Sequence, residues 1–168
     1  MSGWLAGKTV RLVGESDAIC RALTTQGAHL VDVDDCDVLI LVVPSPVKQL
    51  AHEIDHDGWR AVLDAGLDRC FLAARDFASS RRTIGRGGVI IFVAAPEQAL
   101  GADHAAAIGG LGNLTKTLGV EWARDGIRVN SVQTFNTGDV LGSLVAYLAS
   151  DYAAYVTGAN VGIGLEDG

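Results

Sequence analysis

The sequence predicts an α/β fold in which a parallel, doubly wound sheet of about six strands carries helices on both faces. Short β-branched segments alternate with longer segments of helical periodicity along the chain. The segment 38–43 is apolar at every position, as expected for a strand covered on both faces. No repeat, linker or change in composition divides the 168 residues, so one domain spanning 1–168 is expected.

Each expected element follows from its local pattern. Strands are predicted at 8–13, 28–33, 38–43, 88–93, 127–132 and 160–165, and helices at 16–25, 58–82, 103–124 and 140–150. Apolar side chains in 58–82 recur near a period of 3.6 residues, which predicts one buried helix face. Gly126 stands where a glycine commonly ends a helix, just after 103–124.

Composition excludes several classes of function. The chain has 13 basic and 20 acidic residues, a net charge of −7, and no basic stripe, which argues against nucleic acid and anionic membranes as partners. Its longest apolar run, 38–44, is too short to span a bilayer, and no secretory leader is visible. Cys20, Cys36 and Cys70 are odd in number and lack metal-binding spacing, so we expect reduced thiols, no metal and a cytoplasmic protein.

Several segments resemble the short-chain dehydrogenase/reductase family. The stretch 5–14, LAGKTVRLVG, is similar to the family's first strand and glycine turn. The most specific similarities are RVN at 128–130 and YVTG at 155–158. The resemblance covers nearly the whole chain. It implies a Rossmann-like domain, NAD(P) as cofactor and oxidoreductase activity.

The cofactor loop departs from the family's TGxxxGxG pattern, whose glycines let a pyrophosphate approach the backbone. Gly14 is retained, but Ala18 and Cys20 occupy the other two glycine positions. Their Cβ atoms are expected to crowd a diphosphate and so to close the cleft. Glu15 and Asp17 are expected to repel a diphosphate.

Three residues remain candidates for a vestigial cofactor site: Gly14, Ile19 and Asp34. Asp34 stands where the family's acidic residue binds the adenosine ribose and selects NAD. It also belongs to the acidic stretch 32–37, which would form a turn without any ligand.

The family's catalytic residues are replaced. A Tyr, a Lys four residues later, a Ser and an Asn act together in the family, and the resemblance aligns these positions with His104, Ile108, Ala94 and Gly66. An isoleucine supplies no cation to lower the pKa of a neighbouring acid. We therefore expect no catalytic residue in this set, although His104 titrates in a useful range by itself.

The segments that are shorter than in the family and the segments that are retained have different roles in that family. Between the second strand and Asp37 there is no room for the family's usual third strand and its helix, and the substrate-covering segment after Val132 is short. The retained segments, 58–82, 103–124 and the C-terminal part, are those through which the family oligomerises. Small residues at 105–107 and glycines at 109, 110 and 112 would let another helix approach closely.

Three functional hypotheses follow. The first is a catalytically inactive family member, a pseudoenzyme, that serves as an oligomerisation or scaffold partner in a homo-oligomer or beside an active NAD(P)-dependent dehydrogenase and binds no cofactor itself. The alternative is an NAD(P)-dependent oxidoreductase that interconverts an alcohol and a ketone with an atypical site around His104. The third is a small-ligand or nucleotide-binding module that uses Gly14 and Asp34 without turnover.

Overall fold

The computed structural model describes residues 3–95, 100–135 and 137–163. In these ranges six parallel strands form one sheet in the order β2-β1-β3-β4-β5-β6. The strands are β1 (Thr9–Val13), β2 (His29–Leu30), β3 (Val38–Val42), β4 (Gly88–Ala94), β5 (Ile127–Gln133) and β6 (Asn160–Gly162). The predicted α/β class and parallel sheet are confirmed.

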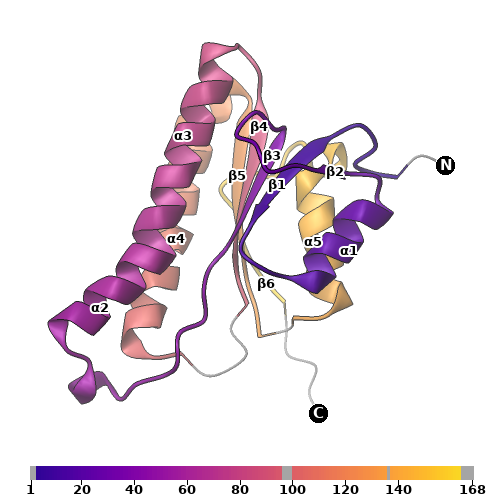
Figure 1. Cartoon of the computed structure of the whole chain (residues 1–168). Helices are drawn as coiled ribbons and strands as arrows, with labels where there is room; N and C mark the ends of the chain where they lie inside the picture. Colours follow the sequence, from indigo (N-terminus) through magenta and orange to yellow (C-terminus); the bar gives the residue numbers. More distant parts are fainter. Residues whose placement is uncertain (1–2, 96–99, 136, 164–168) are drawn as a thin grey trace.

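Helices cover both faces of the sheet (Figure 1). On one face lie α1 (Asp17–Thr25) and α5 (Asp139–Ala149); on the other lie α2 (His56–Leu63), α3 (Arg69–Thr83) and α4 (Ala102–Glu121). None of the helices in the described ranges is long and apolar enough to cross a membrane. The two layers of helices make the sheet doubly wound, as the alternating pattern predicts.

The sheet separates two hydrophobic cores, because successive strand residues point to opposite faces. Ile40 and Val93 belong to the core under α1 and α5. Leu39 and Phe92 belong to the core under α3 and α4. The central strands therefore have no polar face, which explains why 38–43 is apolar throughout.

The helix predicted at 58–82 is composite. It begins at His56, because the Asp55 side chain accepts a hydrogen bond from the N–H of Gly58 at 2.7 Å and caps the helix. After α2 comes one π-helical turn, η2 (Asp64–Asp68), and then α3. The helix predicted at 103–124 ends at Glu121, followed by a 3₁₀ turn and Gly126 with φ +71°. That glycine closes the segment as predicted.

The strand predicted at 28–33 is only two residues long. It lies at the sheet edge and pairs with β1 alone in the described residues. After it the chain runs back to the start of β3, where the N–H of Asp37 donates to the carbonyl of Thr9 at 3.0 Å. Because no further strand pairs with its outer edge in the described residues, β2 stays short. For the strand predicted at 160–165, β6 ends at Gly162 and positions 164–165 lie outside the described residues.

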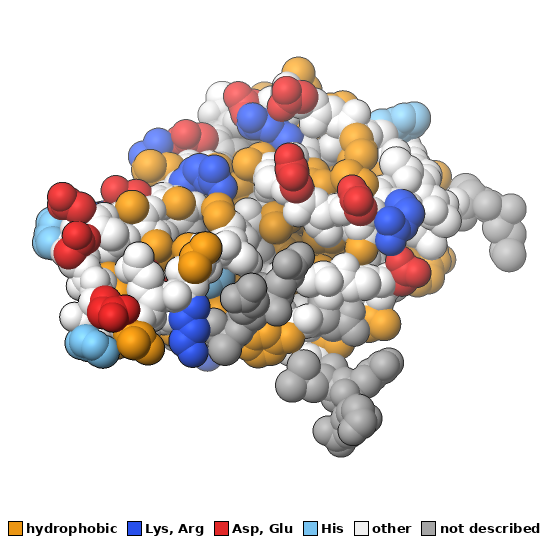
Figure 2. All heavy atoms as spheres, turned by 60° about the horizontal axis from the view of Figure 1, so that its bottom comes forward, with side chains coloured by type: hydrophobic (Ala, Val, Ile, Leu, Met, Phe, Trp, Pro, Cys, Tyr) orange, Lys and Arg blue, Asp and Glu red, His pale blue; other side chains and the backbone are white. Residues whose placement is uncertain are grey.

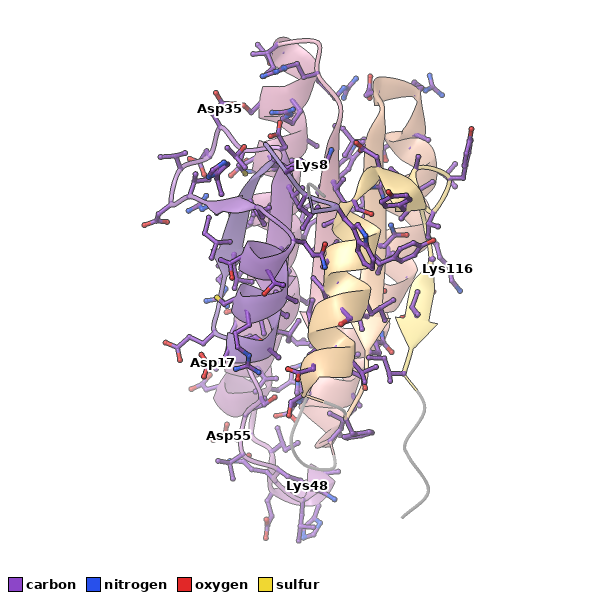
Figure 3. All side chains as sticks on the ribbon, turned by 90° about the vertical axis from the view of Figure 1, so that its right-hand side faces the viewer. Lys8, Asp17, Asp35, Lys48, Asp55 and Lys116 are labelled. Carbon is purple, nitrogen blue, oxygen red and sulfur yellow. The ribbon has the colours of Figure 1, made fainter. Side chains whose placement is uncertain are left out.

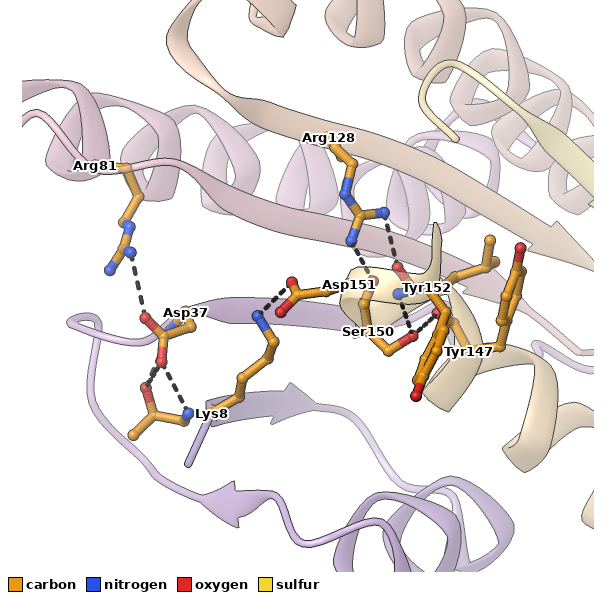
Figure 4. Close-up of polar contacts among 10 residues, drawn as sticks. Lys8, Asp37, Arg81, Arg128, Tyr147, Ser150, Asp151 and Tyr152 are labelled. Atoms are coloured by element: carbon orange, nitrogen blue, oxygen red, sulfur yellow. Dashed lines mark hydrogen bonds and ion pairs between the residues drawn. The ribbon is translucent and has the colours of Figure 1, made fainter. Parts of the chain in front are cut away.

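The RVN segment ties β5 to the C-terminal part of the chain (Figure 4). The Arg128 guanidinium donates to the carbonyls of Leu148 at 2.8 Å and Ser150 at 3.0 Å, at the C-terminal end of α5. The Asn130 side chain donates to the carbonyl of Val156 at 2.9 Å. Carbonyls at a helix end lack intrahelical donors, so Arg128 satisfies groups that would otherwise be unpaired.

Candidate functional site

A cleft of about 670 Å³ opens at the carboxyl ends of the strands. Its walls come from the turn after β1, the start of α1, the ends of β3 and β4, and single residues of α3 and α5. Chain connections leave β1 and β3 in opposite directions at this point, which is where open α/β sheets bind ligands. Figure 2 brings this end of the molecule forward and shows acidic side chains around it, with basic ones interspersed.

The turn that begins the cleft depends on Gly14. Its φ is +94°, and a Cβ atom there would lie 2.9 Å from Cβ of Val42 on the neighbouring strand. Ser16 then caps α1 by accepting a hydrogen bond from the N–H of Ile19 at 3.4 Å. Gly14 and Ile19, two of the three candidate cofactor residues, both lie on the cleft wall.

The expectation that Ala18 and Cys20 close the cleft is wrong. Neither residue lines it. Ala18 faces α5, where Gly142 approaches so closely that a Cβ atom on it would lie 2.4 Å from the carbonyl oxygen of Ala18. Ala18 is buried where α1 packs on α5, and the cleft stays open.

Asp34, the third candidate, does not reach this cleft. Its carboxylate forms an ion pair with Arg11 and is largely exposed. Both residues line a separate cavity of about 190 Å³ beside α3. In Figure 3 the adjacent Asp35 lies near the end of the molecule that holds Lys8, whereas Asp17 at the start of α1 lies toward the other end. The strand that follows β2 in the family is missing here, so the chain turns back to the start of β3 directly after β2. This turn keeps Asp34 away from the cleft.

The four family catalytic positions are all buried, and none is among the residues that line the cleft. Gly66 lies in the π-helical turn, where an added Cβ would be 3.2 Å from Cβ of Ala107 on α4. Ala94 ends β4, and Ile108 packs in the core under α3 and α4. The first two positions thus hold small residues in close packing, and the Lys position is part of the hydrophobic core.

His104 is the one titratable group in the set, and it is only 3% exposed. Its backbone N–H donates to Oδ1 of Asp103 at 2.8 Å, while its ring Nε2 has no hydrogen-bond partner in the described part of the chain. Burial lowers the pKa of the imidazole below its usual range, and the carboxylate of Asp103 opposes this in part. A neutral, enclosed ring is the state that this environment favours.

The cleft carries one basic and two acidic side chains. Arg69, in the first turn of α3, faces it together with Glu15 and Asp17 from the α1 side. The sequence pattern predicts one continuous helix from 58 to 82 and gives no sign that Arg69 lies on the cleft. The π-helical turn inserts an extra residue just before Arg69 and changes the face on which later side chains lie.

The described residues contain no disulfide and no group of side chains that could hold a metal ion. Cys20, Cys36 and Cys70 are free thiols, and no group of three or more His, Cys, Asp or Glu is arranged for a metal ion in that part of the chain. Burial raises the pKa of the Cys70 thiol to about 11, although Arg69 opposes it. Such a thiol stays protonated and unreactive.

Comparisons with known proteins place the fold. The chain is 28% identical to cis-4-hydroxycyclohexanecarboxylate dehydrogenase of Sinomonas cyclohexanicum, over 88% of this chain and 70% of that protein. It is 29% identical to 3beta-hydroxysteroid dehydrogenase 1 of Eggerthella lenta, over 61% of this chain and 52% of that protein. A short-chain type dehydrogenase/reductase from Mycobacterium marinum superposes with a TM-score of 0.84 at 20% identity, over 95% of this chain and 94% of that one. No family model matches.

The chain is thus similar in sequence to two dehydrogenases and shares its fold with short-chain dehydrogenases/reductases. A Beutenbergia cavernae protein with bound NADP at low occupancy has a similar fold, with a TM-score of 0.81 at 21% identity over 94% of this chain and 95% of that one. The chain spans only about half of the Eggerthella lenta relative. Its sheet has the parallel order described above, and the positions that the resemblance aligns with the family's catalytic residues hold Gly66, Ala94, His104 and Ile108.

Proposed function

We propose that this chain is a non-catalytic subunit of a short-chain dehydrogenase/reductase assembly, which supplies a folded helical surface to a second subunit. The second subunit is either another copy or an active NAD(P)-dependent dehydrogenase. The observation that carries the proposal is the set of catalytic positions. Three of them hold Gly66, Ala94 and Ile108, and the fourth holds a histidine whose ring is buried away from the cleft.

Proton transfer explains why this observation matters. A general acid must reach the reacting oxygen, directly or through one water, with a pKa near the working pH. His104 is enclosed and its pKa is lowered, and the family's lysine position is the buried Ile108. The side chains that do line the cleft include Ser16, Ser45 and Thr137, whose hydroxyls are weak acids.

The outer face of α4 supports the subunit role. Ala102, Ala105, Ala106 and Gly109 are exposed and follow one another at helical spacing. A Cβ atom on Gly109 would have no neighbour within 4 Å, so this glycine is not needed for packing inside the chain. Further along, Val120 is 78% exposed, and Leu72 on the adjacent α3 is 44% exposed. A second helix could cover these apolar groups at short range.

Substitution of Gly109 tests this surface. Glutamate at this exposed position improves helix propensity and should leave the single chain folded, but it places a charge on the α4 face. We expect the wild-type chain, alone or with a short-chain dehydrogenase encoded beside it, to sediment as an oligomer at micromolar concentration. Gly109→Glu should dissociate it, and Thr24→Glu on the opposite layer should not. A monomeric wild type that binds no dehydrogenase would refute the proposal.

The second candidate is an NAD(P)-dependent oxidoreductase with an atypical site. Both similar curated proteins are named as dehydrogenases, and the cleft is large enough for a small-molecule ligand. In this case the purified chain alone should oxidise NAD(P)H in the presence of a cyclic ketone. His104→Phe should abolish that turnover without unfolding the protein. Turnover that needs only this chain would replace the first proposal with the second.

A further inference from the structure

We propose that His104 is a pH-sensitive switch on the first turn of α4: the turn stays folded while the imidazole is neutral and unwinds when the imidazole takes up a proton. This goes beyond the proposed function, because the switch acts within a single chain. Only its effect on association rests on the proposed function. His104 is the third residue of α4 and lies on the buried side of its first turn.

The ring of His104 is enclosed, and one of its nitrogens has no partner. The residue is 3% exposed, and Nε2 is a buried atom without a hydrogen-bond partner in the described part of the chain. In a neutral imidazole one ring nitrogen carries no proton, whereas in an imidazolium both nitrogens are donors. Protonation in the closed structure would therefore bury a charge together with an unpaired donor, which costs far more than burying the neutral ring.

The place of His104 in the helix acts in the same direction. The first turn of a helix presents unpaired N–H groups and the positive end of the helix dipole, and both disfavour a cation. The carboxylate of Asp103 opposes this, but Asp103 is itself 5% exposed and its Oδ1 already accepts the N–H of His104 at 2.8 Å. The pKa of His104 is accordingly lowered, with burial as the largest cause.

Neighbouring elements do not offer the imidazolium a carboxylate. Among the described residues, Asp103 is the one charged group that acts on the pKa of His104. No residue of β4 is charged, and Arg128 of β5 donates to carbonyls at the end of α5. The charged or titratable groups nearer the first turn are mostly exposed, and the acidic ones have partners: Arg60 pairs with Asp64 and Asp68, His56 contacts Asp57, and Lys48 lies in the segment after β3.

The first turn of α4 is weakly held. Its N-cap residue is Gly101, and no side-chain hydrogen bond caps the helix. The first backbone hydrogen bond runs from the N–H of Ala105 to the carbonyl of Gly101 at 2.9 Å. A terminal turn unwinds at a lower free energy than the whole domain unfolds. Unwinding exposes the ring of His104 to water, so protonation shifts the turn toward its open state.

The turn also carries one end of the α4 face that we assign to a second subunit. Ala102, Ala105 and Ala106 are exposed there and would lose their helical spacing when the turn unwinds. The open turn binds a proton below about pH 6.5, while the closed turn resists it. The equilibrium constant for opening should therefore rise by up to about 10-fold per pH unit below that value, until the pKa of the folded state is reached. Association should weaken over the same range.

Amide hydrogen exchange of the full chain between about pH 8 and about pH 5, corrected for the intrinsic rate, tests the switch. In the wild type, protection of residues 105–107 should fall by up to about 10-fold per pH unit below about pH 6.5, while residues 115–121 of the same helix stay protected. In His104→Phe, whose ring binds no proton, protection of 105–107 should not depend on pH. His56→Gln removes an exposed histidine from the first turn of α2 and is the matched control, which should behave as the wild type does.

A second neutral variant guards against disturbed packing. His104→Gln keeps a polar side chain and should also remove the pH dependence. The inference is overturned if protection of 105–107 in the wild type does not change with pH, or if the change persists in both variants. It is also overturned if 115–121 loses protection in parallel, since whole-chain unfolding would then be the cause. Sedimentation of Gly109→Glu near neutral pH tests the proposed function separately, so the two failures can be told apart.

Discussion

Arg81 and Asp37 join α3 to the amino end of the sheet. The Arg81 side chain is 4% exposed, and its Nη2 lies 3.3 Å from Oδ1 of Asp37. The other guanidinium nitrogens donate to the carbonyls of Gly87 at 2.8 Å and Cys36 at 3.1 Å. Oδ2 of Asp37 accepts from the N–H and hydroxyl of Thr9 (Figure 4). This network holds the end of the connection from β2 to β3, where the family has a further strand.

Removal of Arg81 should therefore destabilise the chain. Arg81→Met would leave a partly buried carboxylate and two carbonyls without their donor, and we expect a loss of about 2–4 kcal/mol in the free energy of unfolding. Urea denaturation of the variant measures it. Arg82→Met, which removes only a half-exposed ion pair with Asp125, should cost less than about 1 kcal/mol. Equal losses in both variants would contradict the network's role.

Acid should weaken the same network. Burial disfavours the charged form of Asp37, but the Thr9 hydrogen bonds and Arg81 outweigh it and hold the pKa of the carboxyl below its ordinary value. The folded state thus binds fewer protons than the unfolded state, and the contribution is complete above the ordinary pKa near 3.9. It is lost as pH falls below that value through the folded pKa. Asp37→Asn should be less stable than wild type near neutral pH, with a smaller further loss on acidification.

His104 should make stability depend on pH in a higher window. Because burial lowers its pKa, the unfolded chain takes up a proton below about pH 6.5 while the folded chain resists it. Stability should therefore rise with pH from the folded pKa up to about 6.5. His104→Gln should remove this slope in urea denaturation at a series of pH values. A slope that persists in the variant would show that another group causes it.

Restoring the family's lysine should harm the fold. Ile108 is 6% exposed within the core under α3 and α4, so the charged group of Ile108→Lys would lose its hydration without a partner. We expect a loss of about 2–5 kcal/mol and no gain of dehydrogenase activity, even together with Ala94→Ser and His104→Tyr. Ile108→Val, which stays apolar, should cost about 1 kcal/mol. Activity in the triple variant would show that the cleft can still reach these positions.

Two helical glycines should respond to alanine with opposite signs. At Gly142 a Cβ atom would overlap the carbonyl oxygen of Ala18, so Gly142→Ala should force α5 from α1 at a cost of about 1–3 kcal/mol. At Gly109 a Cβ atom meets nothing, so Gly109→Ala should raise the free energy of unfolding by up to about 1 kcal/mol. Thermal unfolding at low protein concentration compares the two. Destabilisation by both changes would contradict the finding that the face of α4 around Gly109 is open.

The sequence was a good guide to the elements and a poor guide to the cleft. Alternation of β-branched and helical segments located all six strands, most clearly β3, which is apolar for its whole length because both of its faces are covered. The helix from 58 to 82 was found, but not its π-helical turn, since insertion of one residue leaves average periodicity almost unchanged. The expected closing of the cleft by Ala18 was wrong, because Ala18 is buried where α1 packs on α5 and does not line the cleft.

Local chemistry and periodicity thus determined, from the sequence alone, the α/β class and the order of strands and helices along the chain. Only the tertiary structure decided that the cleft stays open, that Arg69 faces it and that Asp34 does not. The physical reason is the range of the interactions involved. Strand and helix formation depend on neighbours a few residues away, whereas the position of a side chain in a cleft depends on how distant elements rotate against one another to pack.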